Sequence, residues 1–77
     1  MIKTNKFSQF VVCINNSGYH ASLELHKIYC VITDQDAAKE GDIRIIDESG
    51  EDYLYPSAMF AAIHVPQLVE ESLLQAS

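Results

Sequence analysis

The sequence predicts a mainly β fold, a small five-stranded barrel followed by a short α-helix. Short apolar runs rich in Val, Ile and Tyr alternate with polar turn residues along the chain, which is typical of β-strands. Two of these runs, 43–47 and 52–55, flank Ser49 and Gly50 closely enough to form a hairpin. The 77 residues make one domain, near the lower size limit for a single hydrophobic core.

The first half of the chain contains two predicted strands and the loops beside them. Residues 10–14 (FVVCI) and 28–33 (IYCVIT) are β-branched and bounded by polar residues, as buried strands are. Residues 15–18 (NNSG) favour a turn, because Asn and Gly tolerate positive φ. Residues 19–26 have no clean periodicity and predict a long loop. Residues 34–41 (DQDAAKEG) fit either one helical turn with the final glycine as its left-handed cap or a polar loop.

The second half of the chain predicts the hairpin, a turn and a last strand. Ser49 and Gly50 join the two hairpin strands, either in a two-residue turn or in a slightly longer one with a bulge at Gly50. Pro56 has no amide hydrogen to donate, and we expect it to end the fourth strand. Residues 57–59 then predict a 3-10 turn, and residues 60–63 (FAAI) the fifth strand.

A C-terminal helix is predicted from about residue 66 to residue 76, after a barrel that covers about residues 8–64. Pro66 suits the first position of a helix. The apolar residues that follow recur at the spacing of one helical face, opposite a set of polar side chains. The predicted apolar face consists of Val69 and Leu73 with Leu68 and Leu74 beside them, opposed by Glu70, Glu71 and Gln75.

The charge balance disfavours nucleic acid and membrane surfaces as partners. Five basic residues stand against eleven acidic ones, for a net charge of −6. Binding to phosphates and to anionic lipid depends largely on Lys and Arg, so a basic protein is the natural electrostatic partner. The apolar run at 10–14 is shorter than the roughly 7–15 residues of a secretory core and the about 20 of a membrane span. We therefore expect a cytoplasmic protein.

The layout resembles the SH3-like barrel over roughly residues 10–63, most closely at YPSAMFAAI (55–63). A more specific resemblance is to a family of short, uncharacterised bacterial proteins. The shared pattern is S-G-Y at 17–19, K-x-Y-x-V at 27–31 and R-I-I-D-E-S-G-E-D-Y-L-Y-P at 44–56. Both resemblances imply an SH3-like fold, and neither implies an activity.

The chain departs from signalling SH3 domains at the residues that form their peptide groove. The resemblance places Ile14 and Asn16 at the first-strand tyrosines and Met59 at the terminal tyrosine, and the chain contains no tryptophan. Pro56 alone matches the groove pattern. Polyproline ligands dock between aromatic ridges, so we do not expect this chain to bind them.

Four acidic residues around the hairpin are the weak candidates for a metal site: Asp47, Glu48, Glu51 and Asp52. In a two-residue turn, Asp47 would face Asp52 and Glu48 would face Glu51, and like charges in these positions destabilise a sheet. Ca²⁺ or Mg²⁺ would relieve the repulsion. The default alternative is that the carboxylates point into water or bind the turn amides.

The remaining metal-binding and nucleophilic residue types do not form a recognisable motif. The histidines at 20, 26 and 64 and the cysteines at 13 and 30 lack the short paired spacings of zinc sites. Cys13 and Cys30 lie in apolar runs, which indicates buried, reduced thiols rather than nucleophiles. We therefore predict no cofactor, no catalytic residue and no enzymatic activity.

The aromatic residues lead to the predicted interaction surface. We expect Tyr29 and Tyr55 in the core and Tyr19, in the long loop, within reach of a partner. The predicted partner-binding residues are Tyr19, Leu54, Pro56 and Met59, with His26 nearby. The expected function is a small cytoplasmic, non-enzymatic protein-interaction module that binds a protein partner or a second copy of itself. The alternatives are an RNA- or translation-associated barrel and a barrel that binds a divalent cation.

Overall fold

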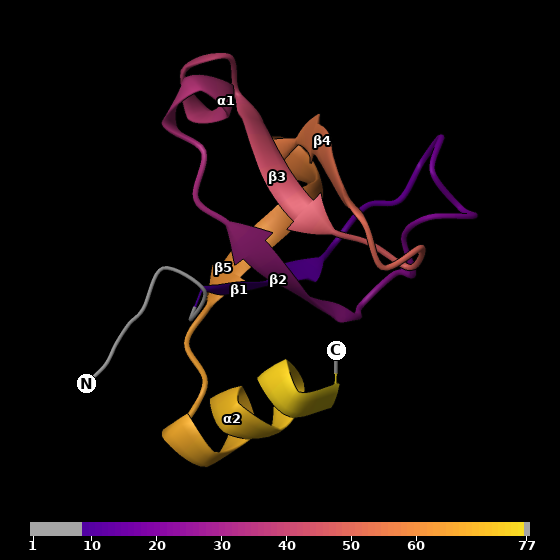
Figure 1. The fold of residues 1–77 in the computed structure, drawn as a ribbon. Helices are drawn as coiled ribbons and strands as arrows, with labels where there is room; N and C mark the ends of the chain where they lie inside the picture. Colours follow the sequence, from indigo (N-terminus) through magenta and orange to yellow (C-terminus); the bar gives the residue numbers. More distant parts are fainter. Residues whose placement is uncertain (1–8, 77) are drawn as a thin grey trace.

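The order of the secondary structure elements agrees with the prediction. The computed structural model describes residues 9–76. Figure 1 shows the elements in space. They are β1 (Phe10–Cys13), β2 (Ile28–Ile32), α1 (Gln35–Lys39), β3 (Asp42–Ile46), β4 (Asp52–Pro56), a 3-10 turn (Ser57–Met59), β5 (Phe60–Ile63) and α2 (Gln67–Ala76).

The strands form one antiparallel, five-stranded sheet in the order β4-β3-β2-β1-β5. β1 pairs with both β2 and β5, so that Phe10 lies opposite Cys30 on one side and Ile63 on the other. β2 also pairs with β3 on its other side, and β3 pairs with β4. The sheet, the 3-10 turn and the C-terminal helix confirm the predicted fold class, whereas closure of the sheet into a barrel stays a prediction.

The core lies on one face of the sheet, because side chains alternate between the two faces of each strand. The core includes Tyr29 and Tyr55, as predicted. Phe60 joins the two rings edge to face, with its centroid 6.5 Å from that of Tyr29 and 6.1 Å from that of Tyr55. The fully enclosed side chains belong to Cys13, Leu23 and Ile45. The side chains of Cys13 and Cys30 are thiols and do not form a disulfide with each other.

The β3–β4 turn is the longer of the two predicted alternatives. The N–H of Gly50 donates to the carbonyl of Asp47 at 2.9 Å, and the N–H of Asp47 donates to the carbonyl of Glu51 at 3.1 Å. Gly50 has a φ of +84°, which only glycine adopts at little cost. Ile46, not Asp47, therefore lies opposite Asp52, and Asp47, not Glu48, meets Glu51. Both predicted oppositions, Asp47 with Asp52 and Glu48 with Glu51, are wrong.

Four predicted strands have bounds that differ from the structure by one residue. β2 ends at Ile32 rather than at residue 33, and β3 covers Asp42–Ile46 rather than 43–47. β1 ends at Cys13, one residue earlier than expected, and the side chain of Ile14 is 51% exposed. Pro56 belongs to β4 and pairs with Asp42 of β3. The ladder loses no hydrogen bond there, because the nitrogen of Pro56 faces the outer edge of the sheet.

Both predicted helices are present. At α1, the carboxylate of Asp34 accepts the N–H of Ala37 at 3.0 Å and caps the helix, while Gly41 follows its end with a φ of +79°. The apolar face predicted for α2 is wrong in part. Leu73 is half-buried, but Leu68 is 80% exposed, because five residues place it about 140° around the helix axis from Leu73.

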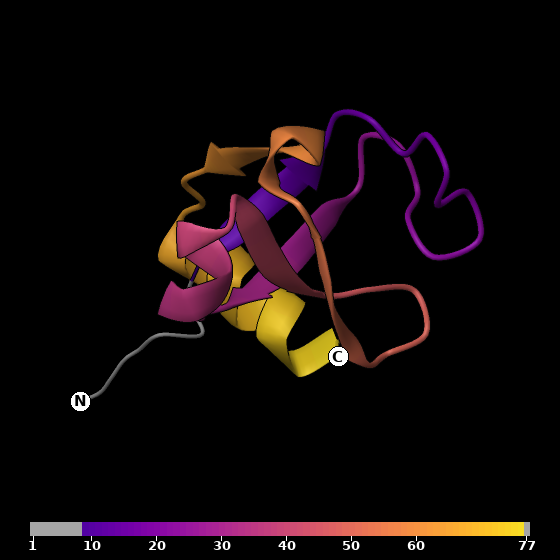
Figure 2. The ribbon, with the colours of Figure 1, turned by 90° about the horizontal axis from the view of Figure 1, so that it is seen from above.

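Figures 1 and 2 show the long loop and the β3–β4 turn extending on the same side of the molecule. α2 lies on the other side of the sheet from the 3-10 turn, at the end of the connection that leaves β5. The predicted start of the domain at about residue 8, and the N-terminal residues 1–8 as a whole, lie outside the described residues.

His26 generates a prediction about stability, because it has a φ of +68° without being glycine. Its N–H donates to the carbonyl of Cys13 at 2.7 Å, which keeps the backbone in this left-handed conformation. Replacing the side chain by hydrogen removes the steric cost but adds entropy to the unfolded chain. We expect His26→Gly to raise the free energy of unfolding by about 0.5–1 kcal/mol in urea titrations. His20→Gly, at a loop position without positive φ, is the control, and an equal gain there would contradict this explanation.

Candidate functional site

The long loop, residues 14–27, is bound to the turn between β3 and β4 by hydrogen bonds. The N–H of Glu48 donates to the carbonyl of Ser22 at 3.0 Å. The hydroxyl of Tyr29 donates to the carboxylate of Glu48 at 2.5 Å and accepts the N–H of Glu24 at 2.7 Å. Lys27 forms an ion pair with the same carboxylate at 2.7 Å. One glutamate thus connects β2, the loop and the hairpin.

The charges in this cluster stabilise one another. The hydrogen bond from Lys27, with a second from Tyr29, holds the pKa of Glu48 below its usual value. The same contact raises the pKa of Lys27. Burial, together with the bond to Glu48, raises the pKa of Tyr29 well above that of an exposed tyrosine. At neutral pH the phenol is therefore a neutral donor and the carboxylate a charged acceptor.

Asp47 is a buried carboxylate with a structural role in the turn. Its side chain accepts the N–H and the hydroxyl of Ser49 at 2.8 and 2.5 Å, and the hydroxyl of Tyr55 at 2.5 Å. Burial opposes ionisation, but the bonds from Ser49 and Tyr55 outweigh it and lower the pKa of Asp47. Each of the two residues before Ser49 therefore accepts a hydrogen bond from a core tyrosine. Tyr55 donates to Asp47, and Tyr29 donates to Glu48.

The four acidic residues of the hairpin point in different directions. Asp47 points inward and Glu48 toward the loop, while Asp52 pairs with Arg44 of β3 at 2.9 Å. Glu51 accepts the hydroxyl of Tyr53 at 3.2 Å. Within residues 9–76, no group of three or more His, Cys, Asp or Glu side chains is arranged to hold a metal ion.

The predicted partner-binding residues surround β4 and the 3-10 turn. The ring of Tyr19 packs edge to face on Tyr55, with 4.9 Å between the centroids, and 38% of Tyr19 remains exposed. Met59 is half-buried against the core, and its carbonyl accepts the N–H of Ile14 at 2.8 Å. Leu54 is 45% exposed and lies opposite Arg44.

These residues lie on both sides of β4 rather than in one patch. Alternation along the strand places Tyr53 and Tyr55 on the core face and Leu54 and Pro56 on the outer face. Tyr19 therefore extends the core side of the strand, whereas Leu54 points away from it. His26 lies at the far end of the long loop, with its backbone bonded to β1.

Sequence reasoning missed the most accessible feature of this region, the open edge of β4. Among residues 9–76, β4 is paired with β3 alone and ends the sheet. Tyr53, which is 50% exposed, projects from this edge strand. The alternation in DYLYP indicates a strand, but the strand order that makes it an edge depends on long-range pairing that the pattern does not contain.

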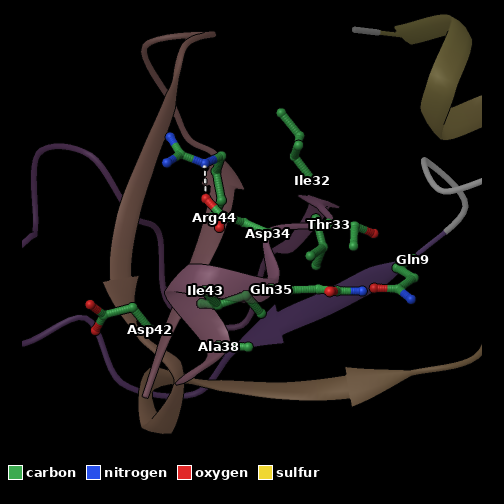
Figure 3. Close-up of a pocket in the computed structure, with 10 residues that line it drawn as sticks. Gln9, Ile32, Thr33, Asp34, Gln35, Ala38, Asp42, Ile43 and Arg44 are labelled. Atoms are coloured by element: carbon green, nitrogen blue, oxygen red, sulfur yellow. Dashed lines mark hydrogen bonds and ion pairs between the residues drawn. The ribbon is translucent and has the colours of Figure 1, made fainter. Parts of the chain in front are cut away.

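A small cavity of about 190 Å³ lies between α1 and the strands β2 and β3 (Figure 3). At its border, Arg44 pairs with Asp34 at 2.8 Å as well as with Asp52. Hydrogen bonds from Ala37 and Arg44 lower the pKa of Asp34. The amide side chains of Gln9 and Gln35 point toward each other across the opening (Figure 3). Because the guanidinium of Arg44 already pairs with two carboxylates, it is not available to bind an anion in this cavity.

A second cavity of about 350 Å³ lies between the outer face of the sheet and α2. Its apolar wall comes from β1, β2, β3 and α2, and Lys27 and Glu48 lie at its border. Burial raises the pKa of the Cys30 thiol in this wall, which keeps the thiol protonated at neutral pH and lowers its reactivity. The apolar wall consists of Phe10, Ile28, Cys30, Ile46 and Leu73.

Comparison with protein-family models, curated proteins and solved structures gives no match to this chain. In the described part of the chain, neither helix has the length and the apolar character needed to cross a membrane. The candidate site is therefore argued from its geometry alone.

The position of the Tyr29 hydroxyl predicts a specific loss of stability. Tyr29→Phe removes the donor to Glu48 and the acceptor for the N–H of Glu24, so we expect the free energy of unfolding to fall by about 1–2 kcal/mol. Tyr53→Phe is the matched control, because the hydroxyl of Tyr53 lies at the surface. We expect its effect to remain within about 0.5 kcal/mol. Equal effects in chemical denaturation would contradict the role assigned to Tyr29.

Glu48 predicts a dependence of stability on pH. Its pKa is lowered in the folded protein, so its contribution is present above the unfolded value of about 4.3 and is lost as the pH falls through the folded value. We expect Glu48→Gln to cost roughly 1 kcal/mol at pH 7 and almost nothing below the folded pKa. Urea titrations from pH 7 to pH 3 measure this difference. A pH-independent cost for Glu48→Gln would be the contrary result.

Proposed function

We propose that this chain is a small, non-enzymatic protein-interaction module. The observation that carries the proposal is the exposure of Tyr53 and Leu54 on β4, at 50% and 45%, on a strand whose inner edge is held in the sheet. Large aromatic and aliphatic side chains on a rigid support form good protein contacts, because little conformational entropy is lost when they bind.

Residues on both sides of β4 add to this exposed edge. Tyr19 adds a partly exposed ring beside Tyr55, and Pro56 adds an exposed, rigid residue at the end of the strand. The anchoring of the loop by Glu48 keeps Tyr19 in this place, so the surface is largely formed before a partner arrives. Met59 follows in the 3-10 turn and completes the proposed partner-binding residues.

The arrangement favours binding over catalysis. The carboxylates of Asp47 and Glu48 have lowered pKa values, whereas a general acid needs a raised one. Both accept hydrogen bonds from core tyrosines that position the turn. The proposed partner is a protein segment rather than nucleic acid, because the chain has a net charge of −6.

Selection of peptides tests the proposed function. The probe is a random library of linear ten-residue peptides, selected on the whole protein, with affinities measured by calorimetry on the synthetic peptides. We expect Tyr19→Ala and Met59→Glu each to lower the affinity for the selected peptides by about tenfold. Each substitution removes apolar contact area worth more than about 1 kcal/mol of binding free energy. Leu68→Glu is the matched control on α2, where the same change should have no effect. No selectable peptide, or equal affinity for all variants, would reject the proposed surface.

A further inference from the structure

The outer edge of β4 has backbone groups that β3 does not use. Two hydrogen bonds mark the ends of the ladder between β3 and β4. The N–H of Asp47 donates to the carbonyl of Glu51 at one end, and the N–H of Ser57 donates to the carbonyl of Gly41 at the other. Hydrogen-bonded pairs alternate with non-bonded pairs along an antiparallel ladder. The register is unbroken between these two ends, so Tyr53 and Tyr55 bond to β3, whereas the backbone groups of Asp52 and Leu54 face outward.

The edge carries only part of the usual protection of an exposed strand, with Asp52 at its start and Pro56 at its end. Natural edges carry lysine, an inward-pointing charge, a bulge or a covering segment. β4 has the sequence DYLYP, with two large exposed side chains at its centre, and its bulge lies outside the strand in the turn. Pro56 ends the row of outward-facing groups, because it has no N–H and its carbonyl accepts a hydrogen bond within the 3-10 turn that follows. Among the described residues, no other segment pairs with this edge.

We infer that β4 binds an extended segment of a partner protein by adding it to the sheet as a further strand. This inference rests on the proposed function and specifies its mode of binding. The N–H and C=O groups of Asp52 and Leu54 bond to the backbone of the segment. Tyr53 on one face and Leu54 on the other contact its alternate side chains.

The charges around the edge select a basic segment. Glu51 precedes the strand, and its carboxylate is bonded to a neutral tyrosine hydroxyl rather than to a cation. The whole chain has a net charge of −6, which attracts a basic segment and repels a second copy of the same chain. The occupant is therefore a segment with apolar residues at alternate positions and a Lys or Arg beside the hairpin end of β4.

Backbone methylation of the selected peptides tests the mode of binding on the wild-type protein. A segment added to β4 turns every second N–H toward the edge, so single N-methyl groups at those positions should weaken binding at least tenfold. N-methyl groups at the intervening positions should weaken it much less. An absence of this alternation overturns strand addition but leaves the proposed function intact, because the peptides still bind.

Substitutions on the protein give a second, independent test. Leu54→Pro removes an outward N–H without removing a hydrogen bond to β3. It should lower the affinity for the selected peptides at least tenfold. Glu51→Lys should weaken them several-fold, whereas Glu71→Lys on α2 should not. Selected peptides that lack Lys and Arg overturn the charge preference. A concentration-dependent dimer in light scattering that Leu54→Pro abolishes would show that a second copy of the chain binds at β4. This result would overturn the proposal that a basic segment of another protein binds there.

Discussion

Two neighbouring carboxylates in one tight turn hold the two halves of the structure together. Asp47 accepts the hydroxyl of Tyr55, and Glu48 accepts that of Tyr29. Both tyrosines are core residues, so the turn is fastened to the interior rather than exposed as a loose hairpin tip. Glu48 then binds the long loop through Lys27 and through its own N–H. Without these contacts the loop would keep Leu23 and the ring of Tyr19 against the core.

The same contacts explain why an acidic turn is compatible with a stable hairpin. Four carboxylates close together in sequence would repel one another if they faced each other across the ladder. The bulge at Gly50 changes the register by one residue, so that Asp47 meets Glu51 through its backbone and Asp52 lies opposite Ile46. Asp47 then turns inward, while Asp52 pairs with Arg44, which also holds Asp34 at the cap of α1. The acidic charge that remains is concentrated near the start of β4.

The proposed binding mode follows from this division between used and unused groups. The inner edge of β4 and its core tyrosine, Tyr55, are fully engaged, which makes the strand rigid. The outer edge, with Tyr53 and Leu54, is left open. A rigid strand with one open edge loses little entropy when it pairs with an extended segment. Structural stability and the proposed partner binding thus depend on opposite edges of the same short strand.

The sequence by itself determined the local elements. Short β-branched runs specified the strands, Pro66 the helix start and the glycines at 41 and 50 the backbone reversals, because these preferences act between residues close in the chain. It also identified Tyr29 and Tyr55 as core residues. Tertiary structure alone decided the positions of the strand edges and the partners of the carboxylates. Glu48 meets Tyr29 across 19 residues of sequence, and the open edge of β4 depends on the order of all five strands, so neither is contained in a local pattern.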